Sequence, residues 1–286
     1  MTKAPAISAA LAARFGPETA EPVPDHALDG VLEAWRQQAI GALLDRRACR
    51  HFRAETVDEP LLRLVIAAGL SAPSKSDLQQ ADVIWVRDRQ LRAQLTAGCG
   101  SWAEALPAEA ELLVVVGDGR RLRRLFGPDW PNDHFDALFN ATGDAAILLG
   151  QLVNAATLAG LGSCPISVMR NSAEVVAAAL ALPERVFPFA GLAIGWPEAP
   201  RAAISPRLGL EATLHIDRFD AAGQEAAIAR YDQRRATEAP YPVERDPERF
   251  GPVSLYGWSE DKRRQYSLPQ RTRWGAFLRA CGFRFD

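Results

Sequence analysis

The longest apolar stretch of the chain, Ala145–Leu161, restricts the fold more than any other feature of the sequence. It is interrupted by Gln151 and Asn154, and it is too short and too polar to span a lipid bilayer. It therefore predicts a buried helix over about residues 139–159, which Gly160 helps to end. A helix with so few polar positions needs cover on most of its surface, either from other layers of the fold or from a second chain.

Further apolar runs have the length and composition of strands. The run from Glu111 to Val116 is apolar after its first residue, as expected for a strand that is buried on both faces. Helices and strands alternate along the chain, which indicates mixed α/β layers, that is, the α+β class. We expect strands at 83–86, 111–116, 163–166 and 187–194, helices at 27–44, from 60 onward and at 173–181, an irregular segment at 117–135, and a mostly helical tail from about 221 with a proline-rich break at 240–252.

Composition and charge argue against several functional classes. The chain has 286 residues, with 33 basic and 35 acidic side chains, so its net charge of −2 gives no global positive field for binding nucleic acid. Its four cysteines and four histidines are scattered without CxxC or HExxH spacing, which argues against a disulfide framework and a metal site. The first 16 residues hold only a short alanine-rich run broken by Arg14, too weak for a signal peptide, so we expect a cytoplasmic protein without a membrane partner.

Familiar catalytic signatures are missing or incomplete. The sequence has no GxSxG nucleophile elbow and no Walker motif. Residues 113–122 read as a strand followed by Gly117 and Gly119, but Leu122 stands where a dinucleotide-binding fingerprint needs its third glycine. An ordinary loop after a strand is the better interpretation.

Two polar clusters flank the helix that Pro60 opens. Arg46, Arg47 and Arg50 lie within five positions, and guanidinium groups that converge in a turn bind phosphate or carbonyl oxygens. The loop 72–79 carries hydroxyl groups, a lysine and main-chain N–H groups that suit a phosphate or a ring carbonyl. Taken alone, the first cluster also fits a solvated charged surface and the second a plain connecting loop.

Four stretches, taken in order, resemble the FMN-dependent nitroreductase superfamily, and most closely its branch of NADPH-flavin oxidoreductases and oxygen-insensitive nitroreductases. The resemblance covers roughly residues 44–286. The first stretch is Arg46-Arg47-Ala48-Cys49-Arg50-His51-Phe52, which looks like the family's H/R-R-S-x-R-x-F, and the second is residues 72–79, which look like A-P-S-S-x-N-x-Q. The third consists of residues 158–171 with Leu182-Pro183 and Gly195-Trp196-Pro197, which follow the family's second half. The fourth is Ser205-Pro206-Arg207, which stands at the family's K-P-R.

The resemblance implies a nitroreductase-like fold with a central, mainly antiparallel sheet flanked by helices. It implies an N-terminal arm and helix at 1–40, an FMN-binding domain at 41–220 and a C-terminal extension at 221–286 that packs on the partner of a homodimer. It also implies an NAD(P)H-dependent FMN oxidoreductase that reduces a small planar acceptor, such as a nitroaromatic, a quinone or a flavin, by a ping-pong mechanism. No protein acid, base or metal is needed, because the flavin carries the redox chemistry.

Site residues follow from the same resemblance. Those implied to bind the cofactor are Arg46, Arg47, Ala48, Arg50, Ser74, Lys75, Ser76, Gln79, Ile166, Ser167, Ser205 and Arg207. Those implied to contact the substrate or NADPH are Trp102, Arg245 and Arg271. We expect Arg271 to favour NADPH over NADH by binding the 2′-phosphate, with Arg245 as the second candidate.

The chain departs from the family pattern at four positions in these stretches. Ala48 replaces a serine, and Ser205 replaces a lysine, which removes a positive charge. Lys75 replaces a serine and could return that charge from another direction. Asp77 stands where many members have asparagine, and a carboxylate near a reduced anionic flavin is repulsive, so we expect Asp77 to point away or to contact an arginine.

Two other functions stay open at this point. The segment 117–135 could be a lid of a specialised flavoenzyme of the same fold, such as a dehalogenase or a flavin-consuming enzyme. The departures at Ala48 and Ser205 could instead indicate a flavin-binding module without turnover.

Overall fold

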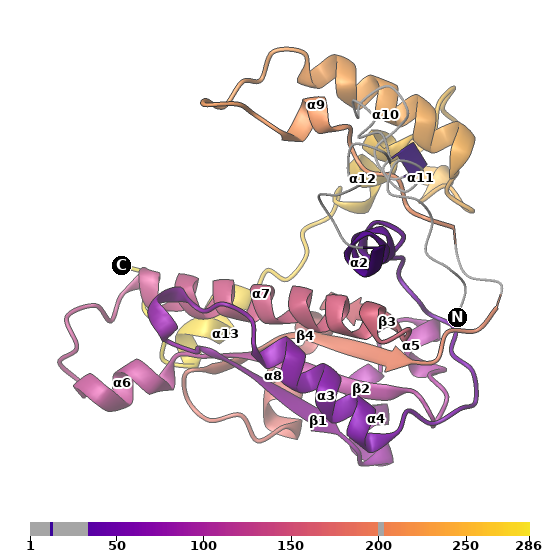
Figure 1. Cartoon of the computed structure of the whole chain (residues 1–286). Helices are drawn as coiled ribbons and strands as arrows, with labels where there is room; N and C mark the ends of the chain where they lie inside the picture. Colours follow the sequence, from indigo (N-terminus) through magenta and orange to yellow (C-terminus); the bar gives the residue numbers. More distant parts are fainter. Residues whose placement is uncertain (1–11, 14–33, 200–202) are drawn as a thin grey trace. The chain divides into compact units, whose positions relative to one another are not determined.

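The computed structural model describes residues 12–13, 34–199 and 203–286, and its contacts divide the chain into two compact units (Figure 1). Unit 1 consists of Met1–Arg47 and Ala202–Gln270, and unit 2 of Ala48–Arg201 and Arg271–Asp286. The arm expected at 1–26, apart from Ala12 and Ala13, and the start of the helix expected from residue 27 lie outside the described residues.

Unit 2 is built on a four-stranded sheet. Its strands are β1 (Ala81–Val86), β2 (Glu111–Asp118), β3 (Gly162–Ile166) and β4 (Val186–Gly195). They lie in the order β1-β2-β4-β3, and every neighbouring pair is antiparallel (Figure 1). The expected α+β class and antiparallel sheet are therefore confirmed, and all four expected strands are present with ends shifted by one or two residues.

Side chains of β2 alternate between two apolar clusters. Leu112, Val114 and Val116 belong to a cluster on one face of the sheet, and Leu113 and Val115 to a cluster on the other. All five are at most 2% exposed. Because alternate side chains of a strand point to opposite faces, a strand that is buried on both faces needs a continuous apolar run, as this sequence has.

Helices cover both faces of this sheet. One face packs against α3 (Glu59–Leu70) and α7 (Phe135–Leu158), and α7 contacts all four strands. The other face packs against α4 (Arg89–Thr96), α5 (Ser101–Glu104), the 3₁₀ turn η3 (Ser167–Ser172) and α8 (Ala173–Ala179). No described helix is both long and apolar enough to cross a membrane.

Residues 271–286 pack in unit 2, although the sequence placed them in the C-terminal extension. Their helix α13 (Trp274–Ala280) contacts α8. Phe277 and Phe283 join a third apolar cluster with Leu138 of α7 and Phe187 of β4. Residues near the end of the chain thus contribute to the apolar packing of unit 2.

The expectation of an irregular segment at 117–135 was wrong in part. Helix α6 (Arg120–Phe126) lies within it, because its arginines and leucines favour a helix and the glycines on either side only limit its length. Helix α7 begins at Phe135 rather than near Phe139, since the His134 ring accepts a hydrogen bond from the Asp136 N–H and caps the helix there.

Helices make up most of the regular structure of unit 1. Its described elements are α2 (Ala34–Leu44), α9 (Leu210–Thr213), α10 (Gln224–Glu238), α11 (Pro247–Phe250) and α12 (Trp258–Gln265). Helices α10 and α12 pack together, with the Tyr231 and Trp258 rings 5.9 Å apart. Asp232 of α10 accepts a 2.7 Å hydrogen bond from the Ser259 N–H in the first turn of α12.

Residues 48–53 run beside β3 and the end of β4. The Cys49 N–H donates to the Ser163 carbonyl at 2.9 Å, and the Arg53 N–H donates to the Trp196 carbonyl at the same distance. Gly162 makes this approach possible, because a Cβ there would lie 2.6 Å from the Cys49 Sγ and 2.7 Å from its Cβ. A glycine is therefore required where the segment crosses β3.

We expect Gly162→Ala to destabilise the protein by about 1–3 kcal/mol, since an added methyl in a close-packed contact forces the main chain to shift. Thermal unfolding measures the loss. Gly275→Ala in α13 is the matched control, because its added Cβ meets nothing closer than the Arg279 Nη1 at 3.6 Å. Equal melting temperatures for the two variants would contradict this account of Gly162.

Candidate functional site

The loop between α3 and β1 holds four of the predicted site residues in one short segment of unit 2. It contains the 3₁₀ turn η2 (Lys75–Asp77). Ser76, Asp77 and Gln79 adopt left-handed φ angles of 50°, 57° and 51°. Each such residue costs about 1 kcal/mol or more relative to an ordinary conformation, so contacts elsewhere must hold the loop in this shape.

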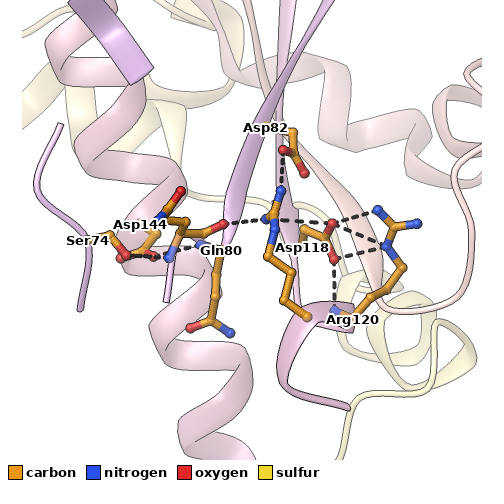
Figure 2. A network of polar contacts seen from close by, with 8 residues as sticks. Ser74, Gln80, Asp82, Asp118, Arg120 and Asp144 are labelled. Carbon is orange, nitrogen blue, oxygen red and sulfur yellow. Dashed lines mark hydrogen bonds and ion pairs between the residues drawn. The ribbon is translucent and has the colours of Figure 1, made fainter. Parts of the chain in front are cut away.

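Asp144 of α7 supplies the main contacts (Figure 2). Its Oδ2 accepts hydrogen bonds from the Ser74 hydroxyl at 2.8 Å and from the Gln80 N–H at 2.9 Å, and its Oδ1 accepts one from the Lys75 N–H at 3.0 Å. The Ser74 hydroxyl oxygen in turn accepts a 2.6 Å bond from the Gln79 N–H. One buried carboxylate, 5% exposed, thereby holds both ends of the loop.

Arg121 of α6 holds the far end of the same loop from a second direction. Its guanidinium donates to the Gln79 carbonyl and pairs with the Asp82 Oδ1 at 2.5 Å. The Asp118 N–H also donates to the Gln80 carbonyl at 2.8 Å. The main chain at 79–80 is thus bonded to α7 on one side and to β2 and α6 on the other.

Asp118, the last residue of β2, lies within the incomplete dinucleotide fingerprint at 113–122. Its carboxylate accepts hydrogen bonds from both the Arg120 N–H and the Arg120 guanidinium at the start of α6 (Figure 2). Burial alone raises the pKa of Asp118, but the hydrogen bonds from Arg120 outweigh it and hold the pKa below its ordinary value. The start of α6 is thus bonded to a carboxylate of the chain itself, and the four strands of the sheet pair antiparallel, unlike the parallel strands of a dinucleotide fold.

Several polar groups of the loop face solvent. Lys75, Ser76, Asp77 and Gln79 are exposed. Asp77 accepts a 3.0 Å bond from the Gln79 side-chain amide, rather than from an arginine. Within the described part of the chain, neither the Lys75 ammonium nor the Ser76 hydroxyl has a hydrogen-bond partner, so both are available to a ligand.

The predicted arginine cluster is divided between the two units. Arg46 and Arg47 end the first segment of unit 1, where Arg47 pairs with Asp45. Ala48 and Arg50 belong to unit 2, and Ala48 bridges to Ser163 of β3. Arg50 is exposed at this position beside the sheet.

The predicted pair at the end of β3 differs in what it can offer. The Ile166 side chain is 1% exposed and packs in the core, so only its main chain can face a ligand. Ser167, the first residue of η3, is exposed. Trp102, the predicted substrate-contacting aromatic residue, has its main chain in α5.

Ser205 and Arg207 lie in unit 1 and line a cavity of about 740 Å³. Arg207 donates to the Ser205 and Pro206 carbonyls at 3.2 and 3.1 Å. Arg235 and Lys262 add positive charge to the walls of the cavity, next to the position where Ser205 lacks the family's lysine. Its other walls are formed by Pro206, Leu208, Thr213, Tyr231, Tyr241 and Trp258.

The two arginines predicted to bind NADPH differ in their partners. Arg245 pairs with the buried Asp261 of α12 at 3.0 Å. Arg271, in unit 2, adopts a φ of 54°, and its buried Nε has no hydrogen-bond partner among the residues that the structure describes. Burial lowers the pKa of the neighbouring Arg170, and repulsion from Arg271 lowers it further. Arg170 and Arg271 thus place two positive charges near each other in unit 2, and Arg170 also donates a 2.7 Å hydrogen bond to the Phe189 carbonyl.

Sequence reasoning missed three residues. Asp144 carries the one charge in α7 beyond its first turn, and a lone carboxylate in an otherwise apolar buried helix is a signal for a polar contact. Arg121 lies in α6, within the segment that the sequence predicted to be irregular, and therefore had no expected position. Arg170 lay inside a matched stretch but had no distinctive spacing, because its proximity to Arg271 arises only from folding.

Comparisons with known proteins cover nearly all of the described chain. Residues 43–196 match the nitroreductase family, and residues 205–286 match the C-terminal domain of the nitroreductase family. An oxygen-insensitive NADPH nitroreductase of Salmonella typhimurium is 34% identical over 197 residues, which are 69% of this chain and 80% of that protein. An FMN reductase [NAD(P)H] of Bacillus subtilis is 34% identical over 190 residues, 64% of this chain and 74% of that protein.

A solved structure agrees with these sequence matches. The NADPH:FMN oxidoreductase from Vibrio harveyi, in complex with NAD⁺, superposes with a TM-score of 0.72 at 26% identity. The match covers 85% of this chain and 97% of the Vibrio protein. The fold that this chain shares with the Vibrio protein, its match to both nitroreductase domains and its 34% identity to the Salmonella enzyme show that this chain belongs to the nitroreductase family.

Proposed function

We propose that the protein is an NAD(P)H-dependent FMN oxidoreductase that reduces planar acceptors such as nitroaromatics, quinones or free flavins. One observation carries the proposal: a loop that Asp144 anchors at both ends exposes the Lys75 ammonium and the Ser76 hydroxyl, neither of which has a partner among the described residues, in a chain that matches both nitroreductase domains. The Salmonella relative is named as an NADPH nitroreductase, the Bacillus relative as an FMN reductase and the Vibrio relative as an NADPH:FMN oxidoreductase, and these names support it.

The donor groups at the exposed positions of unit 2 suit FMN. FMN has a single phosphate and a pyrimidine edge with both donors and acceptors, which call for cations, N–H groups and hydroxyls. Unit 2 offers Arg50, Lys75 and Ser76 on exposed positions. The cofactor contact implied for Arg207, which lies in unit 1, stays a prediction. The Ser74 hydroxyl is bonded to Asp144, so we assign it to holding the loop.

When bound, FMN takes up a hydride equivalent from reduced nicotinamide and delivers electrons to the acceptor. The protein's part is to bind, orient and stabilise charge. Cationic groups beside the ring system stabilise negative charge on it electrostatically. Because one site would serve donor and acceptor in turn, we propose ping-pong kinetics.

A homodimer is part of the proposal. Large apolar side chains stand exposed on α3 and α7 of the single chain, including Leu64 at 66%, Leu70 at 51% and Phe139 at 63%. An interface on these helices would remove them from water, and obligate interfaces bury more than about 2,000 Å². The cytoplasmic location expected from the sequence stays a prediction.

Anaerobic titration of the purified protein with NADPH tests the function. We expect yellow protein that releases FMN, not FAD, on acid treatment and whose visible absorption bleaches when NADPH is added. Reoxidation by a nitroaromatic or quinone restores the colour. A yellow protein that does not bleach would be a binding module without turnover, and protein that binds no flavin would contradict the proposal.

Arg50→Ala should weaken FMN binding about tenfold or more, since a charge-assisted contact to phosphate or carbonyl oxygens contributes about 1.5–3 kcal/mol. Arg53→Ala is the control, because Arg53 pairs with Glu55 at 2.8 Å and lies over the Trp196 ring. Fluorescence titration of the apoprotein gives both dissociation constants. Equal constants would show that the arginine cluster is only a charged surface.

Arg271→Ala should reduce the preference for NADPH over NADH roughly ten- to a hundredfold, because a bidentate arginine–phosphate pair is lost. The ratio of kcat/KM values for the two donors measures it. Arg273→Ala is the control, since Arg273 is 84% exposed and pairs with Glu174. A wild-type enzyme that uses both donors equally well, or a variant that keeps full discrimination, would exclude Arg271 as the selecting residue.

A further inference from the structure

The conformation of the loop Ser74–Gln80 is not one that its own sequence favours. Three of its residues, Ser76, Asp77 and Gln79, have left-handed φ angles, and none of them is glycine. A free segment of this composition would spend little time in that shape. The contacts that select it must therefore come from outside the loop or bridge its two ends.

Asp144 is placed to do this. Its two carboxylate oxygens accept three hydrogen bonds, from Ser74 and Lys75 at one end of the loop and from Gln80 at the other (Figure 2). An ionised carboxylate accepts such bonds more strongly than a neutral group does. Because Asp144 lies on α7, which packs against all four strands, the loop is tied to the helix that covers one face of the sheet.

Arg121 acts on the far end of the loop only. It bonds to the Gln79 carbonyl and is itself fixed by Asp82 at 2.5 Å. Neither Asp144 nor Arg121 is among the groups that we propose to contact the cofactor, and the exposed groups Lys75 and Ser76 lie between the points that they hold.

We propose that Asp144 and Arg121 are positioning residues that preform the cofactor-binding loop before the cofactor arrives. This inference rests on the proposed FMN site. A loop that is already in its binding conformation does not lose further conformational entropy when the ligand binds, so preforming it tightens binding without adding a contact. Loss of either anchor should loosen the loop first and weaken FMN binding as a result.

The lysines of the chain provide a direct assay of the loop. The sequence has lysine at positions 3, 75 and 262 only, and Lys75 is exposed in the middle of the loop. A lysine-specific endoprotease therefore cuts the loop at one peptide bond, the bond after Lys75. Cleavage at Lys262, in α12 of unit 1, serves as an internal reference. The assay works on apoprotein and needs no flavin.

The experiment compares wild type with Asp144→Asn, Asp144→Ala and Arg121→Ala. The matched control is Asp88→Ala, because Asp88 also accepts a main-chain hydrogen bond, from the Leu91 N–H at 2.6 Å, but caps α4 beyond the opposite end of β1. Cleavage rates are followed by mass spectrometry, FMN dissociation constants by fluorescence, and folding by thermal unfolding of the apoproteins.

We expect cleavage at Lys75 to accelerate at least tenfold in Asp144→Ala, relative to cleavage at Lys262, and the FMN dissociation constant to rise at least tenfold. Asp144→Asn and Arg121→Ala should show smaller changes in both, since each keeps part of the anchoring. Asp88→Ala should lose stability but change neither readout. At saturating FMN, the Asp144 variants should recover the wild-type kcat, because the loop acts on binding.

Two outcomes would overturn the inference. Unchanged cleavage at Lys75 in folded Asp144→Asn and Arg121→Ala would show that the loop is held by other contacts. Faster cleavage with an unchanged FMN dissociation constant would show that the anchors serve stability and not the cofactor. Failure of wild type to bind FMN is a different result, which contradicts the proposed function itself and is seen before any variant is made.

Discussion

Pairing between β2 and β4 is the constraint on which unit 2 depends. Both strands are almost wholly buried, so their main-chain N–H and C=O groups have no water to bond with and must bond to neighbouring strands. The antiparallel ladder from Glu111–Ile194 to Asp118–Val186 meets this need. It leaves two apolar faces that only layers of helices can cover, and α7 has to be long and apolar because it lies across all four strands of one face.

The candidate site follows from where that sheet and that helix meet the loops. β1 enters the sheet at Ala81, directly after the loop, and pairs there with Gly117 at the end of β2. Asp118 and Arg121 consequently lie beside residues 79–82, while Asp144 approaches from α7. A flexible connection would have been enough to join α3 to β1. The charged groups around it instead define its path residue by residue.

Much of this fold could be predicted from the sequence, because apolar patterning acts over short distances. Runs such as 111–116 and 187–194 have the signature of doubly buried strands, and the apolar stretch around Leu152 has that of a buried helix. The ordered motifs at 46–52, 72–79 and 205–207 led to the family. Helix α6 differs from the irregular segment that the sequence predicts, because Gly119 and Gly127 directly flank its seven residues and mask a short helix-forming run.

The rest of the site could not be predicted, because it depends on residues far apart in the sequence. Asp144 lies 70 positions from Ser74, and Arg170 lies about 100 positions from Arg271. Neither pairing has a local pattern. The arginine cluster shows the same limit. Its residues are neighbours in the sequence, yet the boundary between the two units lies between Arg47 and Ala48 and divides the cluster.

The left-handed residues of the loop have a consequence for how this sequence can vary. Glycine adopts such conformations with the least strain, and a loop selected only for its shape would contain it at positions 76, 77 and 79. This chain has Ser, Asp and Gln there, and at least the Asp77 and Gln79 side chains bond to each other. Replacement by glycine would relieve strain in the folded loop while widening the conformational freedom of the unfolded chain. Glycine at these three positions would therefore have two costs. It would raise the entropy that the chain loses on folding, and it would remove the polar side chains that the strained conformation presents.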